Sequence, residues 1–470
     1  MASYVNRPGS RGGNISVIEN YKDENGKNRQ KWSRVDTEEE AKRRCKQIEF
    51  EKAMGTYVLP NDITVREFLC RFCETYGGSK WGTSSYTNNV GLIRNYINPI
   101  LGDTRVQDIN ALAADQYVRR LEVTKPVEAK GRKASSQYLS DSTIVKIVKL
   151  LKTAFKHATR WKITRENPFV DVIMPKAKKT ICEIWDVDTF IAALEACEDN
   201  RLALAMHLAF ACSLRVGEIC GLTWDCVHIT DVEIANDKAY LRVDKTLARV
   251  NKDAITALRG ADVIKEFLEK NDAASQTKLV LKAPKTQSSI RKIWIPATLA
   301  KILRTWQAQQ KEIMRVLGNM YHDNNLVLAM DDGRPCEDAV IRKAFRKLQD
   351  KADLPRVTFH SLRHLSTGYK LVCSQGDIKS VQGDTGHSRA EMVTDVYAHI
   401  VDEDRRNNAR RFEADFYANL NLSADYRHDN SQGDNPATID LRALLVQLRN
   451  DPQLAKEFYT LLMDSINGCN

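Results

Sequence analysis

The sequence contains little that would direct the chain to a membrane or out of the cell. Its opening residues, MASYVNRPGSRGGN, have no apolar core, so we expect no secretory signal there. The longest apolar stretch, Leu202–Cys212, contains His207 and is about half the length needed to span a bilayer. We therefore expect a cytoplasmic protein without a membrane partner.

Disulfide, zinc and nucleotide motifs are also missing. Eleven cysteines, an odd number, are scattered along the chain, which is typical of a reducing compartment. Cys70 and Cys73 form a CxxC pair, but no second cysteine or histidine pair follows at zinc-finger spacing. GxxxxGK[ST], GxSxG and HExxH are absent, so a P-loop, a hydrolase nucleophile elbow and a zincin site have no support. We expect neither a metal nor a cofactor.

Positive charge is what the chain has in excess, and it is concentrated in one segment. The net charge is +10. Residues 121–180 hold fourteen Lys and Arg against five Asp and Glu, whereas the last fifty residues hold four against seven. A concentrated basic segment is typical of a surface that binds nucleic acid. A solvated surface is the alternative, and charge alone does not separate the two.

The length of 470 residues predicts two to four domains, because one core rarely serves so long a chain. The pattern predicts a multidomain fold, mostly α with small β-sheets. We expect a β-hairpin-plus-helix module over 1–60, a helical domain over 61–175, an α+β domain over 180–417, and a polar linker with an acidic, amphipathic tail over 418–470.

The N-terminal module is predicted from two short strands on either side of the turn Asp23–Gly26. A helix follows, with Thr37 as its N-cap and Glu40 three residues later, as in a capping box. The strands carry basic residues that are candidates for DNA contact: Arg29, Lys31 and Arg34.

The helical domain is predicted to have helices over 64–76, 85–101 and 110–122, separated by Gly77–Gly78 and Gly102–Asp103. After a basic loop, a fourth helix starts near Ser140 or Asp141 and is amphipathic at about 100° per residue. Its apolar arc holds Ile144, Ile147, Val148, Leu151, Phe155 and Ala158, and the adjacent arc holds Lys146, Lys149, Lys152, Lys156 and Arg160. The apolar face fits a core, and the basic face fits either a DNA backbone or solvent.

The α+β domain is predicted to contain a few strands among its helices. Strands over 238–250 and 276–283 are expected to flank an inserted helical segment around 253–270, which has no role that the pattern reveals. A third strand, over 291–296, follows the turn 284–290.

Several side chains of this domain stand in settings that could fix them for chemistry. Arg215 lies between an apolar helix and another helix start, with Glu218 placed to orient it. His360 and Arg363 are about one helical turn apart and so share a face. Each of these residues alone has a common structural role, such as an ordinary ion pair.

Three further candidates follow the same logic. Lys285 lies in the tight turn APKTQSS between two strands, where a lysine is usually just exposed. His387 follows Gly386, and Tyr397 comes ten residues after it. One tyrosine among fifteen is most often a packing residue, so the order of all the motifs has to decide.

In that order the motifs resemble the catalytic domain of the tyrosine recombinase, or phage integrase, family. The stretches that carry the resemblance are SLRVGEICGLTW, PKTQSSIRKIWIP, TFHSLRHLSTGYK and TGHSRAEMVTDVYAHI. It extends more loosely to the helical domain, which is similar to the family's core-site-binding domain. The N-terminal module resembles the arm-binding module of element-encoded integrases.

The resemblance implies a catalytic set and also shows departures from the family. Thr385 stands where the family often has leucine, and His364 directly follows the arginine of the HSLRH motif. Lys282 and Lys292 are neighbours that compete for the role of the lysine. The implied set is Arg215, Lys285, His360, Arg363 and His387, with Tyr397 as the nucleophile.

We therefore expect a site-specific DNA recombinase that integrates and excises a phage or mobile element. It would cleave and rejoin DNA through a 3′-phosphotyrosyl bond, without metal or ATP, as a homotetramer on core and arm-type DNA sites in the nucleoid of a bacterial host. An excisionase or a host DNA-bending protein would be a further partner. The alternatives are a type IB topoisomerase and a non-catalytic DNA-binding regulator on the same fold.

Overall fold

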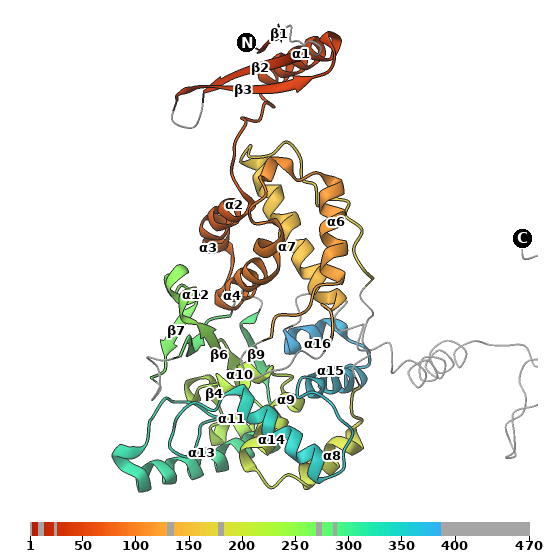
Figure 1. Ribbon diagram of the computed structural model, residues 1–470. Helices are drawn as coiled ribbons and strands as arrows, with labels where there is room; N and C mark the ends of the chain where they lie inside the picture. Colours follow the sequence, from red (N-terminus) through yellow and green to blue (C-terminus); the bar gives the residue numbers. More distant parts are fainter. Residues whose placement is uncertain are drawn as a thin grey trace, which may run out of the picture. The chain divides into compact units, whose positions relative to one another are not determined.

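The computed structural model describes residues 2–7, 14–22, 26–128, 136–176, 183–268, 275–284 and 289–386 (Figure 1). Contacts between residues divide the chain into two units, Met1–Ile400 and Val401–Asn470. The second unit, with the expected linker and tail, lies outside the described residues. The first contains three main hydrophobic cores. No described helix is both long enough and apolar enough to cross a bilayer.

The first core joins a three-stranded antiparallel sheet to one helix. The strands are β1 (Ala2–Arg7), β2 (Asn14–Lys22) and β3 (Asn28–Val35), in that order across the sheet, and α1 (Glu38–Ala53) packs on them (Figure 1). Thr37 caps α1, since its hydroxyl accepts a hydrogen bond from the Glu40 amide. The predicted hairpin and helix are confirmed, but β1 was missed. Its apolar alternation is limited to Ala2 and Tyr4, which pack against the core.

The second core is formed by helices. They are α2 (Val65–Phe72), a π-turn (Cys73–Gly77) and α3 (Gly78–Lys80); α4 (Thr83–Leu92), a π-turn (Ile93–Ile97) and α5 (Asn98–Leu101); a 3₁₀ turn (Val106–Asp108); α6 (Ala111–Glu122); and α7 (Asp141–Arg160). The prediction for α7 is confirmed, because all six residues of its apolar arc are buried and the five cations beside them are exposed.

The predicted helix break at Gly77–Gly78 is wrong. Both glycines have right-handed helical backbone angles, and the chain stays helical to Lys80. A Cβ on Gly77 would lie 2.8 Å from Cε3 of Trp81. That indole is itself held by edge-on contacts with Phe72 and Tyr76. Gly77 is therefore a packing residue that lets the indole approach the backbone, and the helix ends at Trp81.

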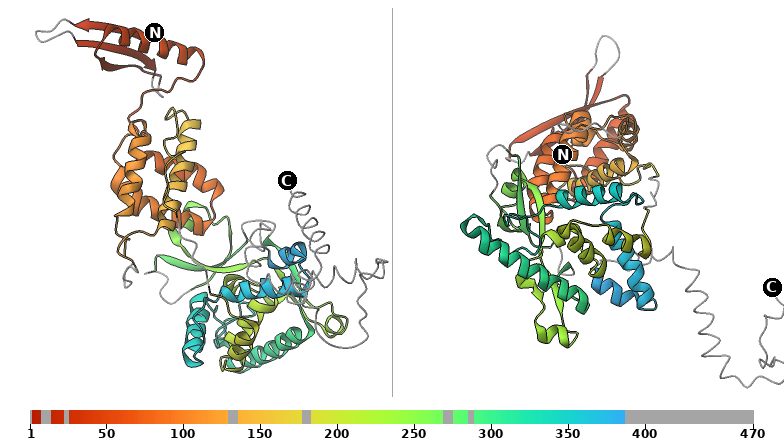
Figure 2. Two further views of the ribbon diagram at one scale, coloured as in Figure 1. Left: turned by 90° about the vertical axis from the view of Figure 1, so that its right-hand side faces the viewer. Right: turned by 90° about the horizontal axis from the view of Figure 1, so that it is seen from below.

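The third core is built around α9 (Asn200–Ala211), which contains most of the longest apolar stretch. This helix packs against α10, α13, α14 and α15 (Figures 1 and 2). The helices of this part are α8 (Val187–Glu195), α9, α10 (Val216–Cys220), α11 (Asp231–Ala235), α12 (Lys252–Ala257), α13 (Ala297–Leu317), α14 (Asp338–Lys351), α15 (Ser361–Cys373) and α16 (Ile378–Thr385), with 3₁₀ turns at Trp224–Cys226 and Gly318–Met320.

Two small antiparallel sheets complete the third part, in agreement with the predicted fold class. One has the order β4-β5-β9 and the other β6-β8-β7. Their strands are β4 (Val227–His228), β5 (Tyr240–Val243), β6 (Thr246–Asn251), β7 (Val263–Glu266), β8 (Thr277–Lys282) and β9 (Arg291–Trp294).

Two predictions about these strands are corrected. The single strand expected over 238–250 is two strands, β5 and β6, which belong to different sheets. Among the described residues of the insertion, up to 268, only α12 is helical. Arg259 and Gly260 then adopt positive φ angles of 51° and 64°, which turn the chain so that β7 pairs with β8.

Gly77 and Gly78 provide a test of this packing. Gly77→Ala should destabilise the helical domain by about 1–3 kcal/mol, because the new methyl group overlaps the held Trp81 ring. A Cβ on Gly78 would meet no atom within 4 Å, and the backbone there is helical, so Gly78→Ala should stabilise the domain by about 0.4–1 kcal/mol. Urea unfolding measures both, and shifts of the same sign would contradict this account.

Candidate functional site

Three arginines from different elements meet in the α+β part. Arg215 is the residue before α10, Arg291 begins β9, and Arg363 lies in the first turn of α15. Arg215 is partly exposed, whereas Arg291 and Arg363 are buried. The elements that supply them are far apart in sequence, so the third core is what brings the three guanidiniums together.

The carboxylate of Glu218, in α10, is the anion that two of these arginines share. Arg215 Nη1 donates to Oε1 at 2.8 Å, and its backbone amide donates to Oε2 at 3.0 Å. Arg291 donates to both oxygens, from Nη2 at 2.9 Å and from Nη1 at 3.3 Å. Burial would raise the pKa of Glu218, but the hydrogen bonds and charge of Arg291, followed by Arg215, outweigh it and lower the pKa to about 2.

Arg363 is buried without a carboxylate partner among the described residues. Its Nη1 donates to the carbonyl of Ser213, and its Nη2 donates to the carbonyl of Thr385 at 2.5 Å. Its Nε is buried and, within the described part of the chain, has no acceptor. Burial and the charge of Arg215 lower the pKa of Arg363, but a guanidinium stays protonated at neutral pH. The site thus holds more positive charge than the one carboxylate balances.

Backbone carbonyls at the C-terminal end of α16 accept a hydrogen bond from each of the three arginines. Arg291 Nε donates to the carbonyl of Asp384 at 2.9 Å, Arg363 donates to that of Thr385, and Arg215 Nη2 donates to that of Gly386 at 3.4 Å. The last carbonyls of a helix lack intrahelical donors and form the negative end of its dipole, so cations stabilise them.

Gly386 adopts the left-handed conformation at this helix end, with φ of 62°. A Cβ there would lie 3.0 Å from Cδ of Arg291. Both the backbone angle and the approaching side chain therefore favour glycine at this position.

His360 lies directly before α15, and the residue as a whole is exposed although its imidazole is partly desolvated. It meets the ring of His364 edge-on, with centroids 4.9 Å apart. Desolvation, His364, Arg363 and Arg215 together lower the pKa of His360. The positive charges of Arg363 and Arg215 are the part of this effect that a bound anion would offset. His364 is less exposed than His360. Burial is the main cause that lowers the pKa of His364, and the charge of Arg363 adds to it.

The rival lysines are both engaged elsewhere. Lys282 is buried, and its Nζ donates to Ser84 Oγ at 2.9 Å and Thr83 Oγ1 at 3.3 Å. Lys292 Nζ lies 3.7 Å from the ring centroids of both Tyr240 and Trp294. Three expected site residues, Lys285, His387 and Tyr397, lie outside the described residues.

Arg291 is the site residue that the sequence analysis missed. A signal for it was present, because β9 alternates buried and exposed residues, with Arg291 and Ile293 inward and Lys292 and Trp294 outward. An arginine on the inward phase of a strand requires a buried anion, and Glu218 is that anion.

The expected DNA-contacting residues do not gather at this site. Arg29, Lys31 and Arg34 are exposed on β3, and the cations of α7 lie on its exposed face. Lys152 Nζ also donates to the carbonyl of Val170 at 2.7 Å. No group of His, Cys, Asp and Glu within the described ranges is arranged to hold a metal ion.

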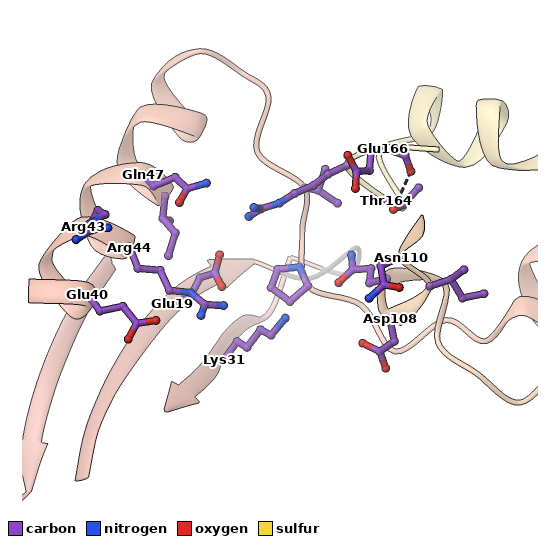
Figure 3. Close-up of a pocket in the computed structure, with 16 residues that line it drawn as sticks. Glu19, Lys31, Glu40, Arg43, Arg44, Gln47, Asp108, Asn110, Thr164 and Glu166 are labelled. Atoms are coloured by element: carbon purple, nitrogen blue, oxygen red, sulfur yellow. Dashed lines mark hydrogen bonds between the residues drawn. The ribbon is translucent and has the colours of Figure 1, made fainter. Parts of the chain in front are cut away.

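Lys31 also lines a cavity of about 750 Å³ (Figure 3). Arg43, Arg44 and Arg165 lie around it, together with acidic residues. The acidic residues are Glu19, Glu40, Asp108 and Glu166. This mixture of charges gives no preference for a phosphate, and we assign the cavity no function.

Comparison with known proteins gives one family. Residues 184–404 match the family model described as "Phage integrase family". A "Tyrosine recombinase XerC-like" protein of Caldanaerobacter subterraneus subsp. tengcongensis is 24% identical over 397 residues, which cover 82% of this chain and 92% of that protein. The "ICEBs1 integrase" of Bacillus subtilis is 25% identical over 279 residues, which cover 58% of this chain and 66% of that protein.

Among solved structures, a fragment of the Tn1549 transposon integrase in complex with a circular intermediate DNA has the same fold. The TM-score is 0.55 at 19% identity, and the match covers 74% of this chain and 99% of that one. This likeness confirms the predicted fold.

The lowered pKa of Glu218 should make the stability of the folded chain depend on pH. Its pKa of about 2 in the folded chain lies below the ordinary 4.5, so folding favours the charged carboxylate. That contribution, roughly 3 kcal/mol, should be complete above the ordinary pKa and should disappear as the pH falls towards 2. In urea unfolding, Glu218→Gln should be less stable than the parent at neutral pH, and the difference should shrink below pH 4.5. Glu195→Gln, at an exposed position, is the matched control. A difference that does not depend on pH would contradict the assignment.

Proposed function

Through residues 184–404 the chain belongs to the phage integrase family of site-specific recombinases, and from this premise we propose that it cleaves and rejoins DNA through a 3′-phosphotyrosyl intermediate. The observation that carries the proposal is the arginine cluster. Arg363 is a buried cation whose Nε has no acceptor among the described residues, and Arg215 beside it is partly exposed. Such a pair suits a phosphate that arrives from solvent.

The scissile phosphate gains negative charge as it approaches the transition state. Two guanidiniums that never lose their protons stabilise that charge, and they do so without reorganising if they are already held in place. We assign this role to Arg215 and Arg363. Arg291 has a different role, because each of its guanidinium nitrogens already donates to Glu218, Asp384 or Ser289. It positions the site.

Tyr397 is assigned as the nucleophile. Its oxygen attacks phosphorus, the bond between phosphorus and the 5′ oxygen breaks, and the DNA 3′ phosphate becomes linked to the tyrosine. A tyrosine pKa near 10 makes the phenol weak, so neighbouring cations must favour its phenolate. His360 and His387 are assigned to exchange protons with the phenol and with the non-bridging oxygens. Rejoining reverses these steps, so neither ATP nor metal takes part in the proposal.

Lys285 is assigned as the general acid that protonates the leaving 5′ oxygen. Support comes from its two rivals. Lys282 is committed to the hydroxyls of Thr83 and Ser84, and Lys292 is committed to two aromatic rings. Neither ammonium is available without breaking those contacts.

We propose two DNA-binding surfaces outside the arginine cluster. The exposed cations of α7 would contact the backbone of the core site, and the basic residues of β3 would contact a separate arm-type site. We further propose that the chain acts as a tetramer and that its natural substrate is the end of a phage or mobile element. The similarity to proteins named as integrases of ICEBs1 and Tn1549 supports the interpretation that a mobile element encodes this chain.

Substitution of Tyr397 tests the assigned nucleophile. Tyr397→Phe should bind core DNA normally but form no denaturation-resistant protein–DNA adduct, because the attacking oxygen is gone. Tyr369→Phe, in α15 against the ring of Phe210, is the matched control and should still form the adduct. An adduct that persists in Tyr397→Phe would show that another residue is the nucleophile. Binding without any adduct in the parent chain would favour a non-catalytic regulator.

Sulfur substitution tests Lys285. A thiolate leaves without protonation, because a thiol has a pKa of about 8.5, far below that of an alcohol. DNA with sulfur in place of the bridging 5′ oxygen should therefore restore cleavage by Lys285→Ala. It should not restore cleavage by Arg215→Ala to the same extent, since that side chain stabilises the phosphoryl group. Rescue of Lys282→Ala or Lys292→Ala in place of Lys285→Ala would show that the acid is misassigned.

Salt titration tests the two DNA-binding surfaces. Alanine at Lys146, Lys149, Lys152 and Lys156 together should reduce the log–log salt slope for core-site binding by about four, roughly one for each phosphate contact. Alanine at Arg29, Lys31 and Arg34 should leave that slope unchanged and weaken binding to arm-type DNA. An unchanged slope in the quadruple variant would indicate that the cations of α7 face solvent and do not contact DNA.

A further inference from the structure

Lys245 lies outside the arginine cluster, at the junction of β5 and β6, and its ammonium is surrounded by acceptors. Its Nζ is 3.1 Å from Thr223 Oγ1 and Asp225 Oδ2, and 3.0 Å from Cys226 Sγ and Asp244 Oδ1. The side chain is 17% exposed. An ammonium has three donors, and four acceptors already surround this one, so it has none left for DNA.

The charge of Lys245 is retained. Burial alone would lower its pKa, but hydrogen bonds with Cys226, Asp244 and Asp225 outweigh burial and raise it. Lys245 therefore ties the β5–β6 junction to the segment 223–226, which begins three residues after the end of α10.

The helix α10 and the strand β6 touch through their backbones. A Cβ on Gly221 would lie 2.5 Å from the amide nitrogen of Leu247, and a Cβ on Gly217 would lie 2.7 Å from Oγ1 of Thr246. These glycines are one helical turn apart, so one face of α10 rests on the first residues of β6. Arg215 stands at the N-terminus of this same helix.

The start of β6 also sets where β8 ends. Thr246 pairs with Lys282, the last residue of β8, and the next residue, Ala283, donates its amide to the carbonyl of Asp262. Lys285 follows three residues after Lys282 in the sequence. The end of β8, which precedes Lys285 in the sequence, is thus fixed to Thr246, which touches the helix that carries Arg215.

We propose that Lys245 is a positioning residue that fixes the end of β8, from which the chain continues to Lys285, relative to the helix that carries Arg215, and so positions the general acid. The proposal rests on the role assigned to Lys285 above. Without the Lys245 ammonium, the start of β6 loses its tie to the segment 223–226, and β8 shifts with it through their pairing. The arginine side of the site keeps its own anchors, because Glu218 still holds Arg215 and Arg291.

The experiment compares cleavage rates on ordinary and on sulfur-substituted DNA for four forms of the full chain: the parent, Lys245→Met, Lys285→Ala and Lys238→Met. Lys238 is exposed and serves as the matched control. Lys245→Met should bind core DNA normally and cleave ordinary DNA about 10- to 100-fold more slowly, since a small misplacement of a catalytic group has effects of this size. Sulfur should restore most of its rate, as it should for Lys285→Ala. Lys238→Met should behave as the parent.

Two outcomes would overturn the proposal. If sulfur rescues Lys285→Ala but Lys245→Met is equally slow on both DNAs, or is not slow at all, then Lys245 does not act through the acid. If Lys285→Ala is not rescued, the general acid itself is misassigned, and the positioning role fails with it. Should Lys245→Met melt below the assay temperature, Asp225→Asn takes its place, because it weakens one of the four contacts and leaves the ammonium in position. It should show a smaller defect that sulfur also rescues.

Discussion

The buried carboxylate of Glu218 is the constraint on which the arrangement of the site depends. Guanidiniums can be buried only if anions or carbonyl oxygens receive their N–H groups, because an unpaired buried charge is costly. Glu218 receives two arginines, and three successive carbonyls at the end of α16 receive one N–H from each of the three. The helix end needs donors as much as the arginines need acceptors. Each therefore fixes the position of the other.

The three arginines differ in which parts of their guanidiniums remain available to a ligand. All three guanidinium nitrogens of Arg291 donate hydrogen bonds, and these contacts reach from β9 to both α10 and α16. Arg363 keeps an Nε without an acceptor among the described residues, and Arg215 keeps an exposed portion. A site that must bind a phosphate strongly only in the transition state benefits from donors that folding has already oriented. The stability cost of holding them is met by the surrounding contacts.

The sequence predicts a structural feature well when the residues that determine it are close to one another in the chain. The cap at Thr37 and the apolar arc of α7 follow from spacing within one helix, and both predictions are confirmed. Gly77 was misread because its partner, Trp81, acts through packing and leaves no mark in the local pattern. The break between β5 and β6 coincides with Lys245, whose acceptors include Asp225 and Cys226, about twenty residues upstream. Arg291 was missed although it falls on the inward phase of β9, because Glu218, the anion it requires, lies 73 residues earlier in the sequence.

The departure at Thr385 has an explanation of the same kind. Leucine is frequent there in the resembling family, yet the contribution of this position to the site is its backbone carbonyl, which receives Arg363. The threonine side chain is fully buried, and its hydroxyl donates to the carbonyl of Val381, one turn earlier in α16. A buried hydroxyl that is satisfied within its own helix costs little. The position therefore requires a buried side chain at a helix end more than it requires leucine, and the arginine cluster is unaffected by the exchange.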